Sequence, residues 1–204
     1  MKREGLLANV AGAVLVGGAS TRMGSDKAQR LFAGVPGATR TSRLLGAHFE
    51  EVLLVGGAPP ADAVGRRVAD AEGPACALRG IVAALAAARA ERVLVVATDL
   101  PLLTPALLLA LVAWPAAEVV LPRSAGGHLE PLCAIWSRKP ALLAARENLV
   151  AGRFALHELV ARLDAGMLDA ADLHAVDPDA VALANANTPD EWSRLESLSN
   201  RGRS

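Results

Sequence analysis

A thirteen-residue segment from Leu15 to Lys27 combines glycines, hydroxyl side chains and two cations directly after a hydrophobic run. Glycines such as Gly17 and Gly18 allow backbone N–H groups to converge on an oxyanion. Arg22 can form a planar fork of hydrogen bonds, and Lys27 can act as a mobile point charge. The chain holds only three lysines, so a lysine inside this segment is informative. The segment therefore predicts a loop that binds phosphate groups.

Two well-known phosphate-binding patterns do not describe this loop. The G-x-x-x-x-G-K-[ST] spacing is absent, because Met23 stands five positions after Gly18 and Ala28 follows Lys27. The G-x-G-x-x-G spacing is absent as well. The alternative interpretation is a glycine-rich turn with incidental charges, which is common for two glycines and a serine but rare for the whole arrangement. We therefore expect a phosphate site of another class.

A second chemical signal is Asp99, in the sequence Ala-Thr-Asp-Leu-Pro that follows the most hydrophobic run of the chain. A carboxylate at the carboxyl end of a strand could hold a hard cation that bridges phosphates. The alternative is that Asp99 only caps the turn before Pro101, since Asp-x-Pro is ordinary turn chemistry. Taken alone, Asp99 fits the turn better.

The pattern L-x-G-G-x-S-x-R-M-G-x-D-K, present at every fixed position, resembles the signature of the molybdenum cofactor guanylyltransferases. This family belongs to a nucleotidyltransferase superfamily that also contains cytidylyltransferases and sugar-nucleotide pyrophosphorylases. The family carries a Mg²⁺-binding aspartate in a strand-Asp-x-Pro segment at about this distance, so the resemblance assigns Asp99 as the Mg²⁺ ligand. It implies transfer of GMP from GTP to the terminal phosphate of molybdopterin, with release of pyrophosphate.

The resemblance also implies roles for individual residues. Lys27, Arg22 and Asp99 are the expected catalytic residues. The expected nucleotide-binding residues are Leu15, Val16, Gly17, Gly18, Lys27, Asp70 and Asp99. Because the attacking phosphate is already an anion, catalysis would consist of positioning and charge neutralisation, with little proton transfer.

The segment around Asp70 matches the family only in part. The family has an aspartate here, followed by a loop that ends in Gly-Pro-Leu-x-Gly, and Leu78 and Gly80 align with that ending. Cys76 and Ala77 stand where the Gly-Pro pair is usual. For Asp70, a solvated loop carboxylate is an interpretation of nearly equal weight.

Two further segments resemble the parts of the family that meet the acceptor. Asn185 and Asn187 precede Thr-Pro-Asp-Glu, as in the family pattern N-x-N-T-P-E-[ED], and their amides could reach the acceptor or a phosphate. His128 to Leu132 also resembles a polar turn that ends in Pro-Leu. Arg153 follows Gly152 before a predicted helix and could pair with the acceptor phosphate, although a solvated arginine near a helix start is the more common case.

The opening of the first motif favours guanine. The guanylyltransferases open Leu-Ala-Gly-Gly and the similar cytidylyltransferases open Pro-Ala-Ala-Gly, whereas this chain has Leu15, Val16, Gly17 and Gly18. Two alternatives remain open at this point. One is a cytidylyltransferase for the same cofactor. The other is a non-catalytic chaperone that binds nucleotide or cofactor, which the altered Cys76 and Ala77 suggest and the intact Lys27 and Asp99 oppose.

The elements that must position these residues follow from hydrophobic patterning. Nearly continuous apolar runs predict buried strands, and longer segments between them predict helices. The strands are expected at Val10 to Val16, Val52 to Val55, Val93 to Ala97, Val119 to Leu121 and Leu132 to Trp136. The helices are expected at Ala38 to Phe49, Gly80 to Ala90, Pro105 to Trp114, Lys139 to Leu149 and Phe154 to Leu163, with a last helix that starts at a Thr188–Glu191 capping box. Short apolar pieces lie at Leu173 to Val176 and Val181 to Ala184.

Alternation of strands and helices indicates an α/β protein. Together with the resemblance, it predicts a single-domain, Rossmann-like three-layer sandwich with a mostly parallel central sheet, the nucleotidyltransferase fold. We expect one domain over residues 1–198, followed by a polar, flexible tail over residues 199–204.

Composition restricts the partners and the location. Lys plus Arg and Asp plus Glu both number 21, so the chain lacks the basic surface that nucleic acids or anionic membranes require. Cys76 and Cys133 are far apart and form no C-x-x-C pair, which argues against a disulfide framework or a zinc site. No apolar stretch reaches membrane-spanning length. We therefore expect a cytoplasmic enzyme whose partners are GTP, molybdopterin and the proteins that mature molybdoenzymes.

Overall fold

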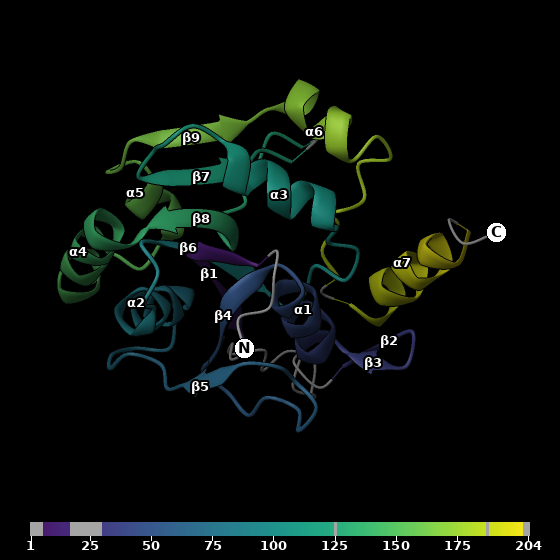
Figure 1. The fold of residues 1–204 in the computed structure, drawn as a ribbon, viewed down its shortest axis with the longest axis horizontal. Helices are drawn as coiled ribbons and strands as arrows, with labels where there is room; N and C mark the ends of the chain where they lie inside the picture. The colour runs from purple at the N-terminus through teal and green to yellow at the C-terminus, as the bar shows by residue number, and fades with distance from the viewer. Residues whose placement is uncertain (1–5, 17–29, 125, 187, 202–204) are drawn as a thin grey trace.

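A mostly parallel sheet forms the centre of the computed structural model, which describes residues 6–16, 30–124, 126–186 and 188–201 (Figure 1). Its seven strands lie in the order β5-β4-β1-β6-β8-β7-β9. They are β1 (Leu7–Leu15), β4 (Phe49–Val55), β5 (Arg66–Val68), β6 (Arg92–Ala97), β7 (Val119–Pro122), β8 (Cys133–Ser137) and β9 (Ala165–Leu168). A separate hairpin consists of β2 (Leu31–Phe32) and β3 (Val35–Pro36).

Helices cover both faces of the sheet and complete three layers (Figure 1). One hydrophobic core lies between the sheet and α2 (Ala77–Ala87), α4 (Arg138–Val150) and α5 (Leu156–Val160). The other lies between the sheet and α1 (Gly37–Gly46), α3 (Pro105–Ala113) and α6 (Ala170–Val176). The helix α7 (Pro189–Arg201) lies at the side of the molecule, next to the β2–β3 hairpin. The α/β sandwich predicted from the sequence is confirmed.

Strand β1 shows why these runs carry little polar sequence. Ala11, Ala13 and Leu15 face the α2 core, whereas Val10 and Val14 face the α1 core, so both faces of the strand are buried. Gly12 lies on the α1 face, where a Cβ would come within 2.9 Å of Leu45 Cδ1. The glycine therefore lets α1 pack closely on the sheet.

The sheet changes its direction of growth between β1 and β6. From β1 the chain continues to β4 and β5 on one side, and then crosses to β6 on the other side of β1. Both pairings of β1 are parallel, and Leu15 at its end lies opposite Val55 of β4 and Ala97 of β6. In open α/β sheets, ligands bind outside the carboxyl ends of the strands at such a switch point. The segments after Leu15 and after Ala97 both start there.

Strand β8 is antiparallel to both of its neighbours, β6 and β7. The β7–β8 connection is therefore a turn at the carboxyl edge of the sheet, with Arg123 and Leu129 forming an isolated bridge. This turn contains the segment from His128 to Leu132 and brings it to the same edge as the end of β6. The backbone N–H of Ala97 donates to the carbonyl of Leu132 over 2.9 Å.

Several predicted boundaries are wrong. Helix α1 ends at Gly46 instead of Phe49, because Phe49 is buried at the start of β4 and lies opposite Leu7. Helix α2 runs over Ala77–Ala87, since Ala88 has an extended backbone with ψ of 143°. The helix predicted from Phe154 to Leu163 is limited to α5. The apolar piece that ends at Val176 belongs to helix α6, which a capping box at Asp169 starts, and the piece from Val181 to Ala184 adopts a turn.

The predicted starts of two helices are confirmed. Thr104 Oγ1 accepts from the backbone N–H of Leu107, and Pro105 opens α3. At α7, the N–H of Thr188 donates to Glu191 Oε2 over 3.0 Å, and the N–H of Glu191 donates to Thr188 Oγ1 over 3.3 Å. The sequence predicts a flexible tail over residues 199–204. Helix α7 continues to Arg201, so the first three of these residues are helical.

No helix within the described residues is long and apolar enough to cross a membrane.

Candidate functional site

The ends of β1 and β6 bring the two strongest sequence motifs to one place. Leu15 and Ala97 are direct neighbours across the parallel β1–β6 pair, and Asp99 follows Ala97 after the buried Thr98. The N–H of Val16 donates to the carbonyl of Val55 over 2.8 Å, which extends the β1 backbone toward the loop. Gly17, Gly18, Arg22 and Lys27 lie outside the described residues.

Val16, the departure from the family's Leu-Ala-Gly-Gly opening, does not protrude from the edge of the sheet. It is 2% exposed and packs in the core on the α1 face. Its two additional methyl groups relative to alanine are therefore accommodated by the protein interior. The backbone of Leu15 and Val16 remains where a phosphate-binding loop would begin.

Asp99 is half-buried and connects to the C-terminal part of the chain. Its carbonyl oxygen accepts the N–H of Ala186 over 3.0 Å, so the segment around Ala186 crosses directly beside the Asp99 backbone. Asn185 is exposed next to this contact, whereas Asn187 lies outside the described residues. The backbone of the Asn185 segment therefore lies next to that of Asp99, and the role of Asn185 toward a ligand stays a prediction.

Glu130 is a second carboxylate near the end of β6, and the sequence motifs give it no role. Burial raises the pKa of Glu130, and the negative charge of Asp99 raises it further, while a hydrogen bond with Ser124 and the charge of His128 oppose the rise. The signal that could have identified Glu130 is its place before Pro-Leu in the His128 to Leu132 segment. Only the antiparallel β8 shows that this segment lies next to the end of β6.

The chemistry of these groups suits Mg²⁺ bound together with a substrate. Within the described residues, no three His, Cys, Asp or Glu side chains form a group that could hold a metal ion. Mg²⁺ bound through one or two carboxylates, substrate phosphates and several waters needs no such group. Asp99 offers a carboxylate at the edge where phosphates are expected, so the donor set fits a metal that arrives with a nucleotide.

Asp70 lies against the same edge, on the β5 side of the sheet. A Cβ on Gly56 would come within 2.7 Å of Asp70 Oδ2, and a Cβ on Gly80 would be 3.7 Å from Asp70 Oδ1 and 3.1 Å from Leu15 Cδ2. The Asp70 carboxylate therefore lies among Gly56, Gly80 and Leu15. Asp70 also lines a cavity of about 330 Å³ together with Gly57, Pro59 and Arg67, a volume within the range of small-molecule pockets.

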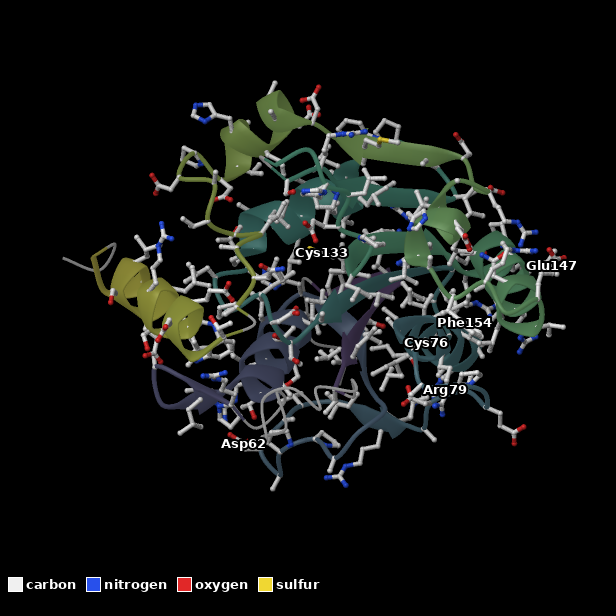
Figure 2. The ribbon with its side chains drawn as sticks, turned by 180° about the vertical axis from the view of Figure 1, so that it is seen from behind. Asp62, Cys76, Arg79, Cys133, Glu147 and Phe154 are labelled. Atoms are coloured by element: carbon white, nitrogen blue, oxygen red, sulfur yellow. The ribbon has the colours of Figure 1, made fainter. Side chains whose placement is uncertain are left out.

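The loop before α2 has a hydrogen-bonded conformation, although Cys76 and Ala77 replace the family's usual Gly-Pro. Cys76 has an extended backbone and precedes the first helical residue, Ala77. The guanidinium of Arg79 donates through Nε to the carbonyl of Ala71 and so closes this loop. Cys76 and Phe154 both pack against the core on the α2 side, where Figure 2 shows them near Arg79.

Arg153 lies on a different connection, between α4 and α5. Its side chain is exposed, its Nε donates to Asn148 Oδ1 over 3.2 Å, and its backbone N–H donates to the Asn148 carbonyl over 2.9 Å. Asn148 itself is fully buried and so fixes the position of Arg153. The described contacts do not join Arg153 to Asp99, and its role toward the acceptor stays a prediction.

The chain is similar to several known proteins. A family model described as the MobA-like NTP transferase domain matches residues 12–166. A protein of Chloroflexus aggregans named "Probable molybdenum cofactor guanylyltransferase" is 35% identical over 195 residues, which cover 92% of this chain and 93% of that protein. The molybdenum cofactor guanylyltransferase of Desulfosudis oleivorans is 30% identical over 203 residues, which cover 95% and 98%.

A solved structure has a similar fold. The molybdopterin-guanine dinucleotide biosynthesis protein A from Archaeoglobus fulgidus superposes with a TM-score of 0.79, at 21% identity, and the match covers 94% of this chain and 99% of that one.

Proposed function

Because the chain belongs to the MobA-like NTP transferase family, we propose that it transfers GMP from GTP to the terminal phosphate of molybdopterin and releases pyrophosphate. The observation that carries this proposal is the pairing of Leu15 with Ala97. This pairing brings the start of the glycine-rich loop and the Asp99 segment to one switch point, where α/β sheets bind ligands.

The reaction forms one bond and breaks one bond at the α-phosphorus of GTP. An oxygen of the molybdopterin phosphate attacks the α-phosphorus in line, and the bond between that phosphorus and the oxygen bridging to the β-phosphate breaks. The bridging oxygen leaves with pyrophosphate. Since the attacking oxygen is already negatively charged, no side chain has to remove a proton from it. The protein contributes orientation and compensates negative charge.

Different residues would bind the phosphates, neutralise their charge and hold the metal ion. The backbone of Leu15 and Val16 leads into Gly17 and Gly18, whose N–H groups would contact phosphate oxygens, while Arg22 and Lys27 would balance their charge. Asp99 would hold Mg²⁺, which when bound neutralises charge on the phosphates. Asp70 would contact the nucleotide, since its carboxylate and the Leu15 side chain both lie next to Gly80.

On the acceptor side, Asn185 and Asn187 would contact molybdopterin or its phosphate. The N–H of Ala186 between them is bonded to the Asp99 carbonyl, which supports a shared site. Arg153 would pair with the acceptor phosphate, with Asn148 fixing its guanidinium.

GTP is the proposed donor because the loop opens Leu15-Val16-Gly17-Gly18. A glycine at position 17 has no Cβ where a purine could lie against the backbone, and Leu15 keeps an N–H that a proline would lack. Val16 is compatible with a guanine site, because its side chain is buried in the core and does not occupy the space proposed for the purine.

The proposed setting is the cytoplasm, with the proteins that mature molybdoenzymes as further partners. Cys76 and Cys133 are free thiols, which suits a reducing compartment.

Pyrophosphate release from each of the four NTPs, with and without molybdopterin, tests this function. We expect release with GTP only when molybdopterin is present. Release with CTP in place of GTP would identify a cytidylyltransferase. Binding of nucleotide or molybdopterin without release from any NTP would identify a carrier protein and contradict the proposal.

A further inference from the structure

A small hydrophobic cluster next to α7 joins the three segments that carry the proposed site. It is separate from the two cores that cover the sheet, and its buried members are Phe32, Leu102, Ala186, Trp192 and Leu195. Phe32 follows shortly after Lys27, Leu102 follows shortly after Asp99, and Ala186 stands between Asn185 and Asn187. Each segment thus contributes one residue, and α7 contributes the other two.

Trp192 makes several of the contacts in and around this cluster. Its ring is 6% exposed and meets the Phe32 ring edge-on, with the ring centroids 5.6 Å apart. Its indole Nε1–H donates to the carbonyl of Leu31. The guanidinium carbon of Arg30 lies 5.2 Å from the centre of the same ring, in the range of a cation–π contact.

A second hydrogen bond joins α7 to the hairpin, and a third joins the segment before α7 to the Asp99 segment. Glu196, one turn after Trp192, accepts the N–H of Ala33 over 2.8 Å. The segment that leads into α7 donates from Ala186 to the Asp99 carbonyl over 3.0 Å. One helix therefore contacts residues that flank the phosphate loop and also residues that flank the proposed Mg²⁺ ligand.

The contacts of α7 are distinct from those that cover the two faces of the sheet. The sheet has its own two cores, and the described side chains of α7 belong to neither of them. The contacts of α7 instead join Phe32, Leu102 and Ala186. These residues are remote in sequence, and each lies near a motif of the proposed site, so the contacts fix the distances between the three segments. Transfer between two bound substrates is sensitive to such distances, since a misplacement of about 1 Å can lower the rate by about 100-fold.

We propose that Trp192 is a positioning residue for nucleotidyl transfer, and that it acts by holding the segments of Phe32, Leu102 and Ala186 in register. The inference rests on the proposed function. In this proposal Trp192 acts through these segments and not by contact with the reacting groups. It sets where the Asp99 segment lies relative to the β2–β3 hairpin, which follows the glycine-rich motif in the chain.

The test compares two tryptophan-to-alanine variants, Trp192→Ala and Trp114→Ala. Trp114 at the end of α3 packs against the core on the α1 face and not in the cluster of Trp192, so it controls for the loss of a large apolar side chain. Pyrophosphate release is measured with GTP and molybdopterin below the Tm of both variants and over a range of Mg²⁺ concentrations. For Trp192→Ala we expect kcat/KM to fall at least ~10-fold, with a higher half-saturating Mg²⁺ concentration. For Trp114→Ala we expect a lower Tm and kcat/KM within about twofold of wild type.

Two milder variants cover the case in which Trp192→Ala does not fold. Trp192→Phe keeps an aromatic ring against Phe32 and should restore most of the activity. Glu196→Ala removes the acceptor of the Ala33 N–H and should lower kcat/KM about threefold, the effect of one hydrogen bond. Wild-type kinetics in Trp192→Ala, or equal losses in both alanine variants, would overturn the inference while leaving the proposed function intact. Absence of transfer by the wild-type protein would instead contradict the proposed function itself.

Discussion

Asp99 lies at a strand end with its side chain half-buried, so its carboxylate can serve a ligand without being part of either core. We expect Asp99→Asn to abolish Mg²⁺-dependent turnover and leave the Tm close to wild type, because the amide keeps the shape but loses the charge that holds a cation. Activity over a Mg²⁺ titration and thermal unfolding of the same sample provide the two readouts. If the variant unfolds while the remaining folded protein responds to Mg²⁺ as before, Asp99 is a structural cap of its turn.

Lys27 is the single lysine of the predicted phosphate loop and lies outside the described residues. We expect Lys27→Ala to fold normally and to lose at least ~100-fold in kcat/KM, since one preorganised charge at a transferring phosphate contributes ~3 kcal/mol. Lys27→Arg should recover little of this, because the planar guanidinium needs oxygens at other positions. Steady-state kinetics with GTP and molybdopterin measure both. Turnover near wild type in either variant would remove Lys27 from the site.

The two cysteines should differ in reactivity. Burial and the nearby Glu130 carboxylate raise the pKa of the Cys133 thiol to about 12, whereas Cys76 is partly exposed at the start of α2. At pH 9 iodoacetamide should therefore modify Cys76 alone in the folded protein and both cysteines in urea, as read by mass spectrometry. Cys76→Ser should then take up no label when folded.

The sign of the Cys133 effect on stability follows from the same pKa. A thiol whose pKa is higher in the folded state stabilises that state fully below its unfolded pKa of about 9, and this contribution is lost as the pH rises toward 12. The free energy of unfolding should thus fall over this range less steeply in Cys133→Ala than in wild type. Labelling of Cys133 in the folded protein at pH 9 would show that its thiol is accessible and ionised.

Gly56, the first residue after β4, lies against the carboxylate of Asp70. Gly56 has φ of +70°, and a Cβ there would collide with the Asp70 carboxylate. Gly34 in the β2–β3 hairpin has φ of +78°, and a Cβ there would meet no atom of the described residues within 4 Å. Both Gly→Ala changes impose a similar backbone strain of about 1–2 kcal/mol.

We therefore expect Gly56→Ala and Gly34→Ala to lower the Tm by similar amounts, while only Gly56→Ala raises the KM for GTP, by about tenfold or 1.4 kcal/mol. The measurement is the KM for GTP at saturating molybdopterin. An unchanged KM in Gly56→Ala would show that Asp70 does not contact the nucleotide.

The elements that the sequence predicts best are those defined by local chemistry. Thr104 with Pro105, and Thr188 with Glu191, start α3 and α7 as expected, because a cap depends on residues within one turn. The sequence predicts Phe49 in a helix, but Phe49 lies in β4, since its burial beside Leu7 depends on a strand remote in sequence. The short strands β5 and β9 were missed for the same reason, as each is defined by pairing with β4 or β7.

For the whole molecule, the sequence predicts the fold class and the position of the Leu15 and Asp99 segments at one edge of the sheet, because parallel strands end at one edge. It does not predict that the charge of Asp99 acts on Glu130, which requires the antiparallel β8. Nor does it predict that Trp192 contacts Phe32, which requires α7 to pack on the β2–β3 hairpin. Contacts between residues so far apart in the chain have no local pattern. The site is consequently a product of the topology as much as of its motifs.

The choice of base tests the account most directly, because it depends on the loop opening, on the buried Val16 and on the family assignment together. Purified protein is given molybdopterin, Mg²⁺ and an equimolar mixture of GTP and CTP, and the dinucleotide products are identified by mass. The account predicts the guanine product, with GTP exceeding CTP by well over ~10-fold in kcat/KM, as expected for a base-reading site worth more than ~1.4 kcal/mol. Equal amounts of the two products, or an excess of the cytosine product, would contradict it.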